Sequence, residues 1–477
     1  MGKVLGKDHI KKDSALKVTG KAEYVADIRL PGMLECKVLK SPYAHAKILS
    51  IDTGDAEKLP GVRAVITHKD KDILLPRPFN TGSRNEFYVL PPDEVYMAGE
   101  QIAAVAAETK EIAEEAIKLI KVELEPLPAV FDPVDALKPD APVIYSDLPD
   151  NRVPTMFPTA VAKGDVNQGF KEADITLQSL YEWPNPAHCP LEPYQTVAKW
   201  EGDELTVWIS TQTLWDVQDY ISGALGIPAS KISVVNKWVG GGFGGKYGPS
   251  HVMLACIAAA LSKKTGRPVR SLLEMDEQFI VSHHAAGPGY YDTRGGIKRS
   301  DGRPVALDTV VHISLGGHAC HEVAAASVIA NAAVNVYNYD TIRAAAYPAY
   351  SNINLAGPKR SYGDAEGMFC SEQFADEMAE AAGMDPMEWR KKWCERASAN
   401  GPTWDSRRIW WVNGFWRSRG LRKFTHRNQP AGAATACDAD VRYREAASGR
   451  RRPCGGCLLK HRASLLRGAD PKERGIR

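Results

Sequence analysis

The stretch from Trp238 to Tyr247 constrains this chain more than any other, because it reads W-V-G-G-G-F-G-G-K-Y. Five glycines fall within six consecutive positions around one phenylalanine. Glycine loses more backbone entropy on folding than any other residue and contributes no side chain to a core. The main chain therefore has to bend sharply here, or has to lie directly against a neighbour or a ligand.

Three interpretations of this glycine stretch compete. Gly240, Gly242 and Gly245 match the dinucleotide pattern G-x-G-x-x-G, but the acidic residue expected about 20 positions later is missing. The stretch also matches G-x-x-x-x-G-K, but Tyr247 stands where a P-loop needs a Ser or Thr hydroxyl for magnesium. The third interpretation is a platform whose consecutive backbone N–H groups face an anionic or oxo-bearing cofactor. We favour the third, with a nucleotide phosphate site and a structural turn as alternatives.

The pattern around the glycine stretch predicts alternating strands and helices. Strands are expected over residues 204–210, 231–239 and 268–273, with helices starting near Leu214 and covering residues 250–264. If these strands are parallel, Gln212 and Phe243 leave the carboxyl ends of neighbouring strands. Open α/β sheets bind ligands at that edge. Gln212 is therefore a candidate ligand-facing amide.

Length and composition are those of a globular protein. A chain of 477 residues can form two to four domains, and 44% hydrophobic with 25% charged residues is ordinary. The apolar runs are too short to span a membrane, and the first residues lack the continuous apolar segment of a secretory signal. We expect a cytoplasmic protein without a membrane partner.

Cysteine and histidine spacing gives no convincing metal site. The nine cysteines are scattered, which favours reduced thiols, and only Cys454 and Cys457 form a C-x-x-C, with His461 close behind. His312, His318 and His321 lack further ligands at a convincing spacing, apart from the neighbouring Glu322. We predict no protein-ligated metal, and an accidental cysteine pair rather than a zinc site.

The last part of the chain differs from the rest. Residues 401–477 hold 15 Arg and 3 Lys against 6 acidic residues, and the tryptophans there follow no helical or strand period. Arginine mixed with aromatics could suit a nucleic-acid-binding tail. We favour aberrant sequence, out of frame or otherwise, that stays disordered, so no nucleic-acid partner is expected.

Several motifs together resemble the molybdenum-binding large subunit of the xanthine dehydrogenase and aldehyde oxidase family. Residues 17–24, 41–48 and 99–108 are similar to that family's a/b hammerhead domain. Six further motifs follow the order of its molybdopterin-binding domain: Gly164-Asp165, Leu191-Glu192-Pro193, residues 210–212, residues 240–246, residues 360–363 and residues 372–390.

The resemblance implies a fold and an activity. It implies an α+β chain, in which a hammerhead domain precedes the first part of a mixed α/β molybdopterin-binding domain. It also implies hydroxylation of an aromatic, heteroaromatic or aldehyde carbon, with water supplying the oxygen, at a molybdenum–molybdopterin cofactor. The nucleotide form of this cofactor stays open, and the cytosine dinucleotide form is one alternative. By resemblance, Gln212, Gly242, Phe243, Gly244 and Arg360 would bind the cofactor, and Tyr247 and Tyr362 would line the substrate pocket.

The chain also departs from the family pattern. Tyr247 stands where purine-oxidising members place a glutamate, and the loop around Arg360 lacks the cysteine of the carbon monoxide dehydrogenase branch. Nothing after about Glu395 resembles the family's second molybdopterin-binding region, which supplies the glutamate base. The catalytic base is therefore unknown in this chain. By the resemblance, iron–sulfur and FAD centres are expected on a small and a medium partner subunit, and the lack of a suitable cysteine cluster in this chain fits an iron–sulfur centre located elsewhere.

We therefore predict a molybdenum hydroxylase large subunit, C-terminally truncated and inactive by itself. The expected organisation is an N-terminal arm (1–16), the hammerhead domain (17–132), a linker (133–158), the first molybdopterin-binding domain (159–395) and the aberrant tail (396–477). Two alternatives stay open: a catalytically inactive binding or assembly module, and a nucleotide-binding enzyme that uses the glycine stretch.

Overall fold

The structure, a computed structural model, describes residues 6, 8–80, 84–155, 159–285, 287–319 and 323–394. The predictions made for His321, Cys454, Cys457 and His461, and for the tail from residue 396, lie outside the described residues. No helix in the described part is long and apolar enough to cross a membrane.

A seven-stranded mixed sheet carries the elements that position the glycine stretch. Its strands, in spatial order, are β13 (Ile232–Val235), β12 (Glu204–Ile209), β11 (Gln195–Glu201), β14 (Val269–Leu272), β1 (Leu34–Lys40), β7 (Gln101–Ala107) and β3 (Val62–Ile66). Strands from the predicted hammerhead domain and from the predicted molybdopterin-binding domain thus belong to one sheet, joined by the parallel pair β1 and β14.

Both faces of β7 are covered, which explains why its sequence is apolar from Ile102 to Ala107. Ala104 and Ala106 belong to the core around helix α7 (Pro249–Thr265), and Ala103, Val105 and Ala107 belong to the core around helix α3 (Lys110–Leu119). Because successive strand residues face opposite sides, a strand covered on both faces carries apolar residues at consecutive positions. Helix α7 is buried along residues 249–262, so it too lacks a polar face.

The unit β12–α6–β13 brings the predicted ligand edge together. Helix α6 (Leu214–Leu225) ends at Gly226 in a left-handed conformation (φ +67°), and β12 and β13 pair in parallel. The predicted strand over residues 231–239 is shorter than expected, because the chain leaves the sheet after Val235. There the side chain of Asn236 donates a hydrogen bond to the carbonyl of Thr211 (2.6 Å).

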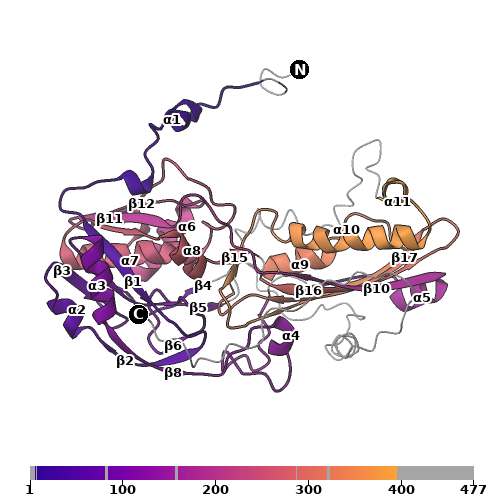
Figure 1. Ribbon diagram of the computed structural model, residues 1–477, viewed down its shortest axis with the longest axis horizontal. Coiled ribbons are helices and arrows are strands. Elements are labelled where there is room, and N and C mark those ends of the chain that lie inside the picture. Colours follow the sequence, from indigo (N-terminus) through magenta and orange to yellow (C-terminus); the bar gives the residue numbers. More distant parts are fainter. Residues whose placement is uncertain are drawn as a thin grey trace, which may run out of the picture. The chain divides into compact units, whose positions relative to one another are not determined.

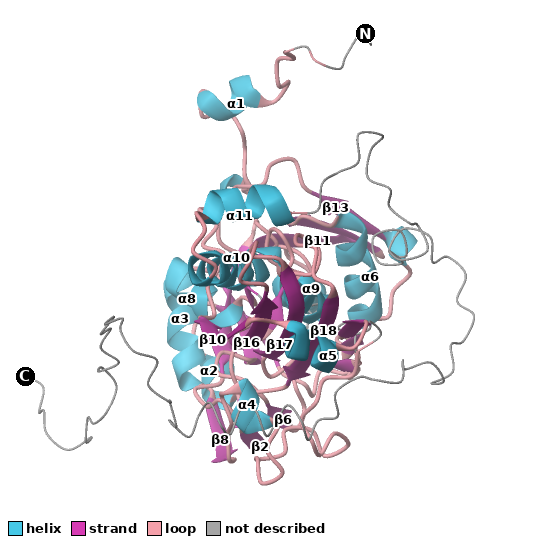
Figure 2. Cartoon of the chain, turned by 90° about the vertical axis from the view of Figure 1, so that its right-hand side faces the viewer, coloured by secondary structure: helices cyan, strands magenta, loops and turns pink. Residues whose placement is uncertain are grey.

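A five-stranded sheet forms the second core. Its order is β10 (Ile175–Trp183), β16 (Gly289–Ile297), β17 (Pro304–Ser314), β18 (Thr341–Ala349) and β9 (Ala160–Lys163). Strands β10, β16, β17 and β18 lie side by side in Figure 2, and Figure 1 shows α9 (Val323–Asn331) and α10 (Asp364–Ala381) along one face of the sheet. Strands β16 and β17 pair antiparallel and form a hairpin.

Shorter elements complete the described part. The three small sheets are β6 (Glu94–Val95), β2 (Ala46–Asp52) and β8 (Lys121–Pro126); β15 (His284–Ala285) and β19 (Ala356–Gly357); and β4 (Phe79–Asn80) and β5 (Asn85–Phe87). The remaining helices are α1 (Ser14–Val18), α2 (Gly54–Lys58), α4 (Pro133–Ala136), α5 (Val166–Glu172), α8 (Met275–Val281) and α11 (Pro386–Trp393), and two 3₁₀ turns cover Val25–Asp27 and Ala229–Lys231.

Candidate cofactor site

The glycine stretch folds into a series of tight turns beyond the end of β13. Gly241 and Gly244 have φ of +102° and +101°, and Phe243 between them has φ of +56°. A left-handed phenylalanine is uncommon and is held here by its neighbours. The amide of Gly245 donates to the carbonyl of Gly242 (2.7 Å). The sequence is glycine-rich because the backbone turns back on itself.

Close approach accounts for the individual glycines as well. A Cβ on Gly244 would overlap the carbonyl oxygen of Pro358, and a Cβ on Gly242 would overlap the side-chain oxygen of Gln212. The backbone of the stretch therefore touches two segments far apart in sequence. One of them precedes Arg360, whose own amide donates to the carbonyl of Phe243 (2.8 Å).

Gln212 lies against the glycine stretch. Its side-chain Oε1 accepts hydrogen bonds from the amides of Gly244 (3.0 Å) and Lys246 (3.2 Å), and its backbone amide donates to the carbonyl of Lys246 (2.9 Å). The expectation that Gln212 and Phe243 follow neighbouring parallel strands is confirmed by the β12–β13 pairing. With Oε1 committed to the stretch, only the Nε2 donor of Gln212 is left for a ligand.

A buried ion pair, which the sequence did not predict, connects the two ends of residues 240–246 in the glycine stretch. The side chain of Lys246 is fully buried, and its Nζ lies 2.9 Å from Oε2 of Glu192 and 2.7 Å from Oγ of Ser210. The same Oε2 accepts from the amide of Gly240 (2.6 Å). Glu192 thus binds both ends of residues 240–246. Burial lowers the pKa of Lys246, and the Glu192 carboxylate acts against that shift.

This ion pair argues against the nucleotide interpretation. A P-loop lysine has to reach the phosphates of its ligand. Lys246 instead points into the protein and is 0% exposed. The glycine stretch offers its ligand backbone amides without the lysine.

Free donors remain on the outer side of the stretch. Among the described residues, the amides of Gly241, Gly242 and Phe243 have no hydrogen-bond partner. The exposed Arg360 guanidinium likewise forms no ion pair within the described part of the chain. Consecutive N–H groups beside a guanidinium form a set of donors that suits an anionic or oxygen-bearing group. The site therefore fits the cofactor that the sequence motifs imply.

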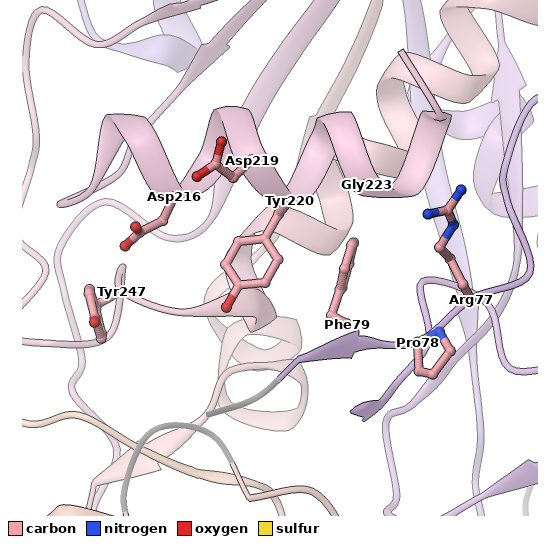
Figure 3. A pocket seen from close by; sticks show the side chains of 8 residues that line it. All are labelled: Arg77, Pro78, Phe79, Asp216, Asp219, Tyr220, Gly223 and Tyr247. Carbon is pink, nitrogen blue, oxygen red and sulfur yellow. The ribbon is translucent and has the colours of Figure 1, made fainter. Parts of the chain in front are cut away.

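Two hollows adjoin the stretch. One, of about 500 Å³, is lined by Phe243 and by three basic or titratable side chains, His188, Lys359 and Arg360, with Pro186, Ala187 and Ser361. The other, of about 370 Å³, is lined by Tyr247 together with residues of α6 and with Arg77, Pro78 and Phe79, where β4 begins (Figure 3). The predicted cofactor residues Phe243 and Arg360 thus line the first hollow, and the predicted substrate residue Tyr247 lines the second.

Tyr362 lines neither of these two hollows. It is half-buried on the loop before α10, in a left-handed conformation (φ +54°) that follows Ser361 at φ +82°. Its amide donates to the carbonyl of Lys359 (2.7 Å). Its role in substrate binding stays a prediction.

Two buried, neutral histidines lie on the inner side of the glycine stretch. His283 is fully buried and lies between Oγ of Ser250 (2.6 Å) and the carbonyl of Gly244 (3.2 Å). His251 contacts Oγ1 of Thr211 (2.8 Å). Burial lowers the pKa of His251 to about 3 and holds the pKa of His283 well below its usual value. Both rings are therefore uncharged at neutral pH, beside a backbone that presents its donors outward.

The metal-binding histidines considered from the sequence have other partners. His312 stacks on Tyr347 with ring centroids 5.4 Å apart, and Nε2 of His318 lies 3.0 Å from the buried Glu100. Within the described residues, no group of three or more His, Cys, Asp or Glu side chains could hold a metal ion.

Comparison with known proteins places this site in a family. The chain matches two family models: "Molybdopterin cofactor-binding domain" over residues 144–394, and "Aldehyde oxidase and xanthine dehydrogenase, a/b hammerhead domain" over residues 19–128. The first match alone covers more than half of the chain. The chain belongs to the molybdopterin-binding large subunits of the xanthine dehydrogenase and aldehyde oxidase family. The expected fold class, a hammerhead domain followed by a mixed α/β molybdopterin-binding domain, is confirmed.

The relatives of this chain vary in length. It is 33% identical over 401 residues to a probable xanthine dehydrogenase subunit of Bacillus subtilis, covering 82% of this chain and 51% of that protein. It is 32% identical over 404 residues to a nicotinate dehydrogenase large molybdopterin subunit of Eubacterium barkeri, covering 82% and 90%. A solved structure of quinoline 2-oxidoreductase from Pseudomonas putida 86 aligns with a TM-score of 0.74 and 28% identity, over 82% of this chain and 50% of that one. The chain thus spans about half of two of these relatives and nearly all of the third.

Proposed function

We propose that this large subunit takes part in molybdenum-dependent hydroxylation of an aromatic, heteroaromatic or aldehyde carbon, with water as the source of oxygen. The observation that carries the proposal is the row of free amides at Gly241, Gly242 and Phe243 beside the Nε2 donor of Gln212. The row lies beyond the carboxyl ends of two parallel strands. Family membership supports a molybdopterin cofactor there.

The proposed roles follow from the contacts. Gln212 would direct its free Nε2 donor toward an acceptor on the cofactor, while Gly242, Phe243 and Gly244 would let the backbone approach it. Arg360 would balance negative charge of the cofactor, because its guanidinium forms no ion pair among the described residues. The bound cofactor supplies the oxygen-transfer and electron-accepting chemistry, and the chain's own residues supply position and electrostatics.

The remaining parts of the reaction would come from outside the described residues. We propose that the base that activates water, and the rest of the cofactor cradle, lie on a segment corresponding to the half that this chain does not span in the Bacillus subtilis and Pseudomonas putida relatives. Iron–sulfur and FAD subunits would then remove the electrons. Substrate contacts would come from Tyr247, which lines a hollow, and from Tyr362.

Metal and pterin analysis tests the proposal. The full chain is expressed in molybdenum-replete cells, purified with whatever subunits accompany it, and its molybdenum and pterin contents are measured. We expect close to one of each per chain. A folded chain without either would overturn the proposal, and retention of partner subunits in that case would favour the assembly-module alternative.

Two substitutions of Gln212 sharpen the test. Gln212→Glu keeps the acceptors for Gly244 and Lys246 but removes the Nε2 donor, whereas Gln212→Met removes both. We expect Glu to preserve the stability of the fold and to lower cofactor retention several-fold, and Met to lower both. Unchanged cofactor content in both variants would contradict the role given to Gln212.

A further inference from the structure

The smaller hollow has walls suited to a flat ring. It lies between α6 and the segment Arg77–Phe79, with Tyr247 at one end, and measures about 370 Å³ (Figure 3). Phe79 and Tyr220 meet edge to face with ring centroids 5.0 Å apart. This volume is near the lower end of the range for small-molecule sites, about 300–1,000 Å³. A ligand of one or two fused rings is the size that such a space accepts.

The charge of this hollow is negative. Asp216 and Asp219 lie three residues apart on α6, and side chains at that spacing share one face of a helix. Within the described part of the chain, neither carboxylate forms an ion pair or a hydrogen bond. Arg77 also lines the hollow, but it lies at the opposite end, beyond Phe79 (Figure 3). The two carboxylates are therefore free to act on a ligand placed among the rings.

The two hollows beside the glycine stretch have opposite charge. Phe243 lines a hollow with Lys359 and Arg360, and Tyr247, four residues later, lines the one with Asp216 and Asp219. Backbone donors and basic groups serve an anionic cofactor. Aromatic faces beside carboxylates serve a cation, which the ring quadrupoles and the carboxylates both attract.

We propose that the hollow between α6 and β4 binds a planar, positively charged nitrogen heteroaromatic ring of the pyridinium or quinolinium class. As a statement about the substrate, this inference rests on the proposed function, because Tyr247 connects the hollow to the cofactor site. The ring stacks among Phe79, Tyr220 and Tyr247, and Asp216 with Asp219 balances its charge. Anionic rings are disfavoured by the same carboxylates.

Three probes of matched shape test the charge preference: 1-methylquinolinium (cation), quinoline at pH 8 (neutral) and quinoline-6-carboxylate (anion). Binding to the full chain, as purified with its cofactor and partners, is measured by titration calorimetry at low ionic strength. We expect the cation to bind about tenfold more tightly than the neutral ring, and the anion most weakly. Equal binding of all three probes, tightest binding of the anion, or no binding of the cation would overturn the proposal.

Substitutions locate the bound probe. Asp216→Asn and Asp219→Asn should each weaken cation binding about fivefold while leaving quinoline unchanged. Gly223→Leu should abolish binding of all probes, because Gly223 lines the hollow and its added side chain would extend toward Phe79. Glu380→Gln, the same charge change on α10, is the matched control and should change nothing. Cation binding that survives both aspartate substitutions would place the probe elsewhere and overturn the proposal.

Failure of this inference can be told apart from failure of the proposed function. A chain that holds molybdenum and pterin but does not discriminate the three probes refutes the substrate class alone. A chain without metal or pterin that still binds the cation through Asp216 and Asp219 refutes the proposed function and supports the ring-binding site. Competition by millimolar Mg²⁺ would overturn the proposal, by showing that the carboxylates bind a simple ion.

Discussion

The ion pair between Lys246 and Glu192 is the part of the site whose removal has the most readily estimated consequence. Lys246→Met keeps most of the side-chain volume and removes the charge together with the N–H donors to Glu192 and Ser210. Glu192 then remains nearly buried, with 7% of its side chain exposed, and keeps two donors, the amide of Gly240 and Oγ of Ser210. A buried carboxylate that has lost its counter-ion destabilises a fold by about 3–5 kcal/mol.

The reciprocal change is expected to cost less. Glu192→Gln still offers an oxygen to Gly240 and Ser210, and Lys246 can lose its proton, since burial already lowers its pKa. We expect a smaller loss than for Lys246→Met, because deprotonating a lysine whose pKa is already lowered by burial costs less than keeping a buried carboxylate charged without its counter-ion. The double variant removes both charges and should cost less than the two single losses combined, by about 2 kcal/mol or more.

Urea unfolding at pH 7.5, followed by circular dichroism, measures these differences, and hydrogen exchange at residues 240–246 reports whether the stretch itself loosens. Lys121→Met is the matched control, because its ion pair with Asp55 is exposed (70% and 51%) and solvent screening leaves such a pair with little effect on stability. The claim that this pair holds the site together would be refuted if each single variant lost less than about 1 kcal/mol of unfolding free energy and the two losses added up in the double variant. Unchanged hydrogen exchange in the stretch would refute it as well.

Three further outcomes follow from the geometry. Gly244→Ala should destabilise the chain by about 2–4 kcal/mol in urea unfolding, because Gly244 has a φ of +101° and an added Cβ would overlap Pro358. The control is Gly202→Ala, where φ is +65° but the added Cβ meets open space, and it should destabilise the chain by only about 1 kcal/mol. The free energy of unfolding should fall as the pH drops from 6.5 to 5, by up to about 1.4 kcal/mol per pH unit for each of His251 and His283. The cause is that both rings bind a proton in the unfolded chain but stay neutral in the folded one. His251→Gln should reduce this slope, and a free energy that does not change with pH would contradict the assignment. Gly223→Ala should raise stability by about 0.5–1 kcal/mol, because it lies in α6 with its nearest neighbour 4.0 Å from the added Cβ.

Local sequence patterns were sufficient for the elements around the site. The periodicity before and after the glycine stretch predicted α6 and α7, and alternation predicted β12, because each of these elements has a defined apolar pattern or is apolar throughout. The parallel pairing of β12 with β13 then placed Gln212 beside Phe243, as expected. Family motifs supplied the domain order, which periodicity alone could not.

The parts that escaped prediction depend on contacts between segments distant in sequence. Glu192 lies 54 residues before Lys246, and nothing in its local sequence shows that its carboxylate binds both ends of residues 240–246. A lysine in a glycine-rich segment reads as a ligand-binding group, and only the folded chain shows its ammonium fully buried. The acidic hollow is similarly hidden, because Arg77–Phe79 and α6 are more than 130 residues apart.

The same buried contacts explain what kind of ligand the glycine stretch can accept. Glu192 withdraws the ammonium of Lys246, and Oε1 of Gln212 takes up the amides of Gly244 and Lys246, so the outward donors reduce to three backbone amides and one amide nitrogen. Such donors bind oxygen atoms well but carry no full charge. The hollow beside them is lined by Lys359 and Arg360, and Lys359 forms an ion pair with Glu366. Arg360 forms no ion pair among the described residues, so it is the cation left for a ligand. A polyphosphate carries several negative charges in one place, and a single arginine would leave most of these charges unbalanced. An oxygen-bearing centre with diffuse charge would not, and this difference favours the molybdenum cofactor over a nucleotide at the same backbone.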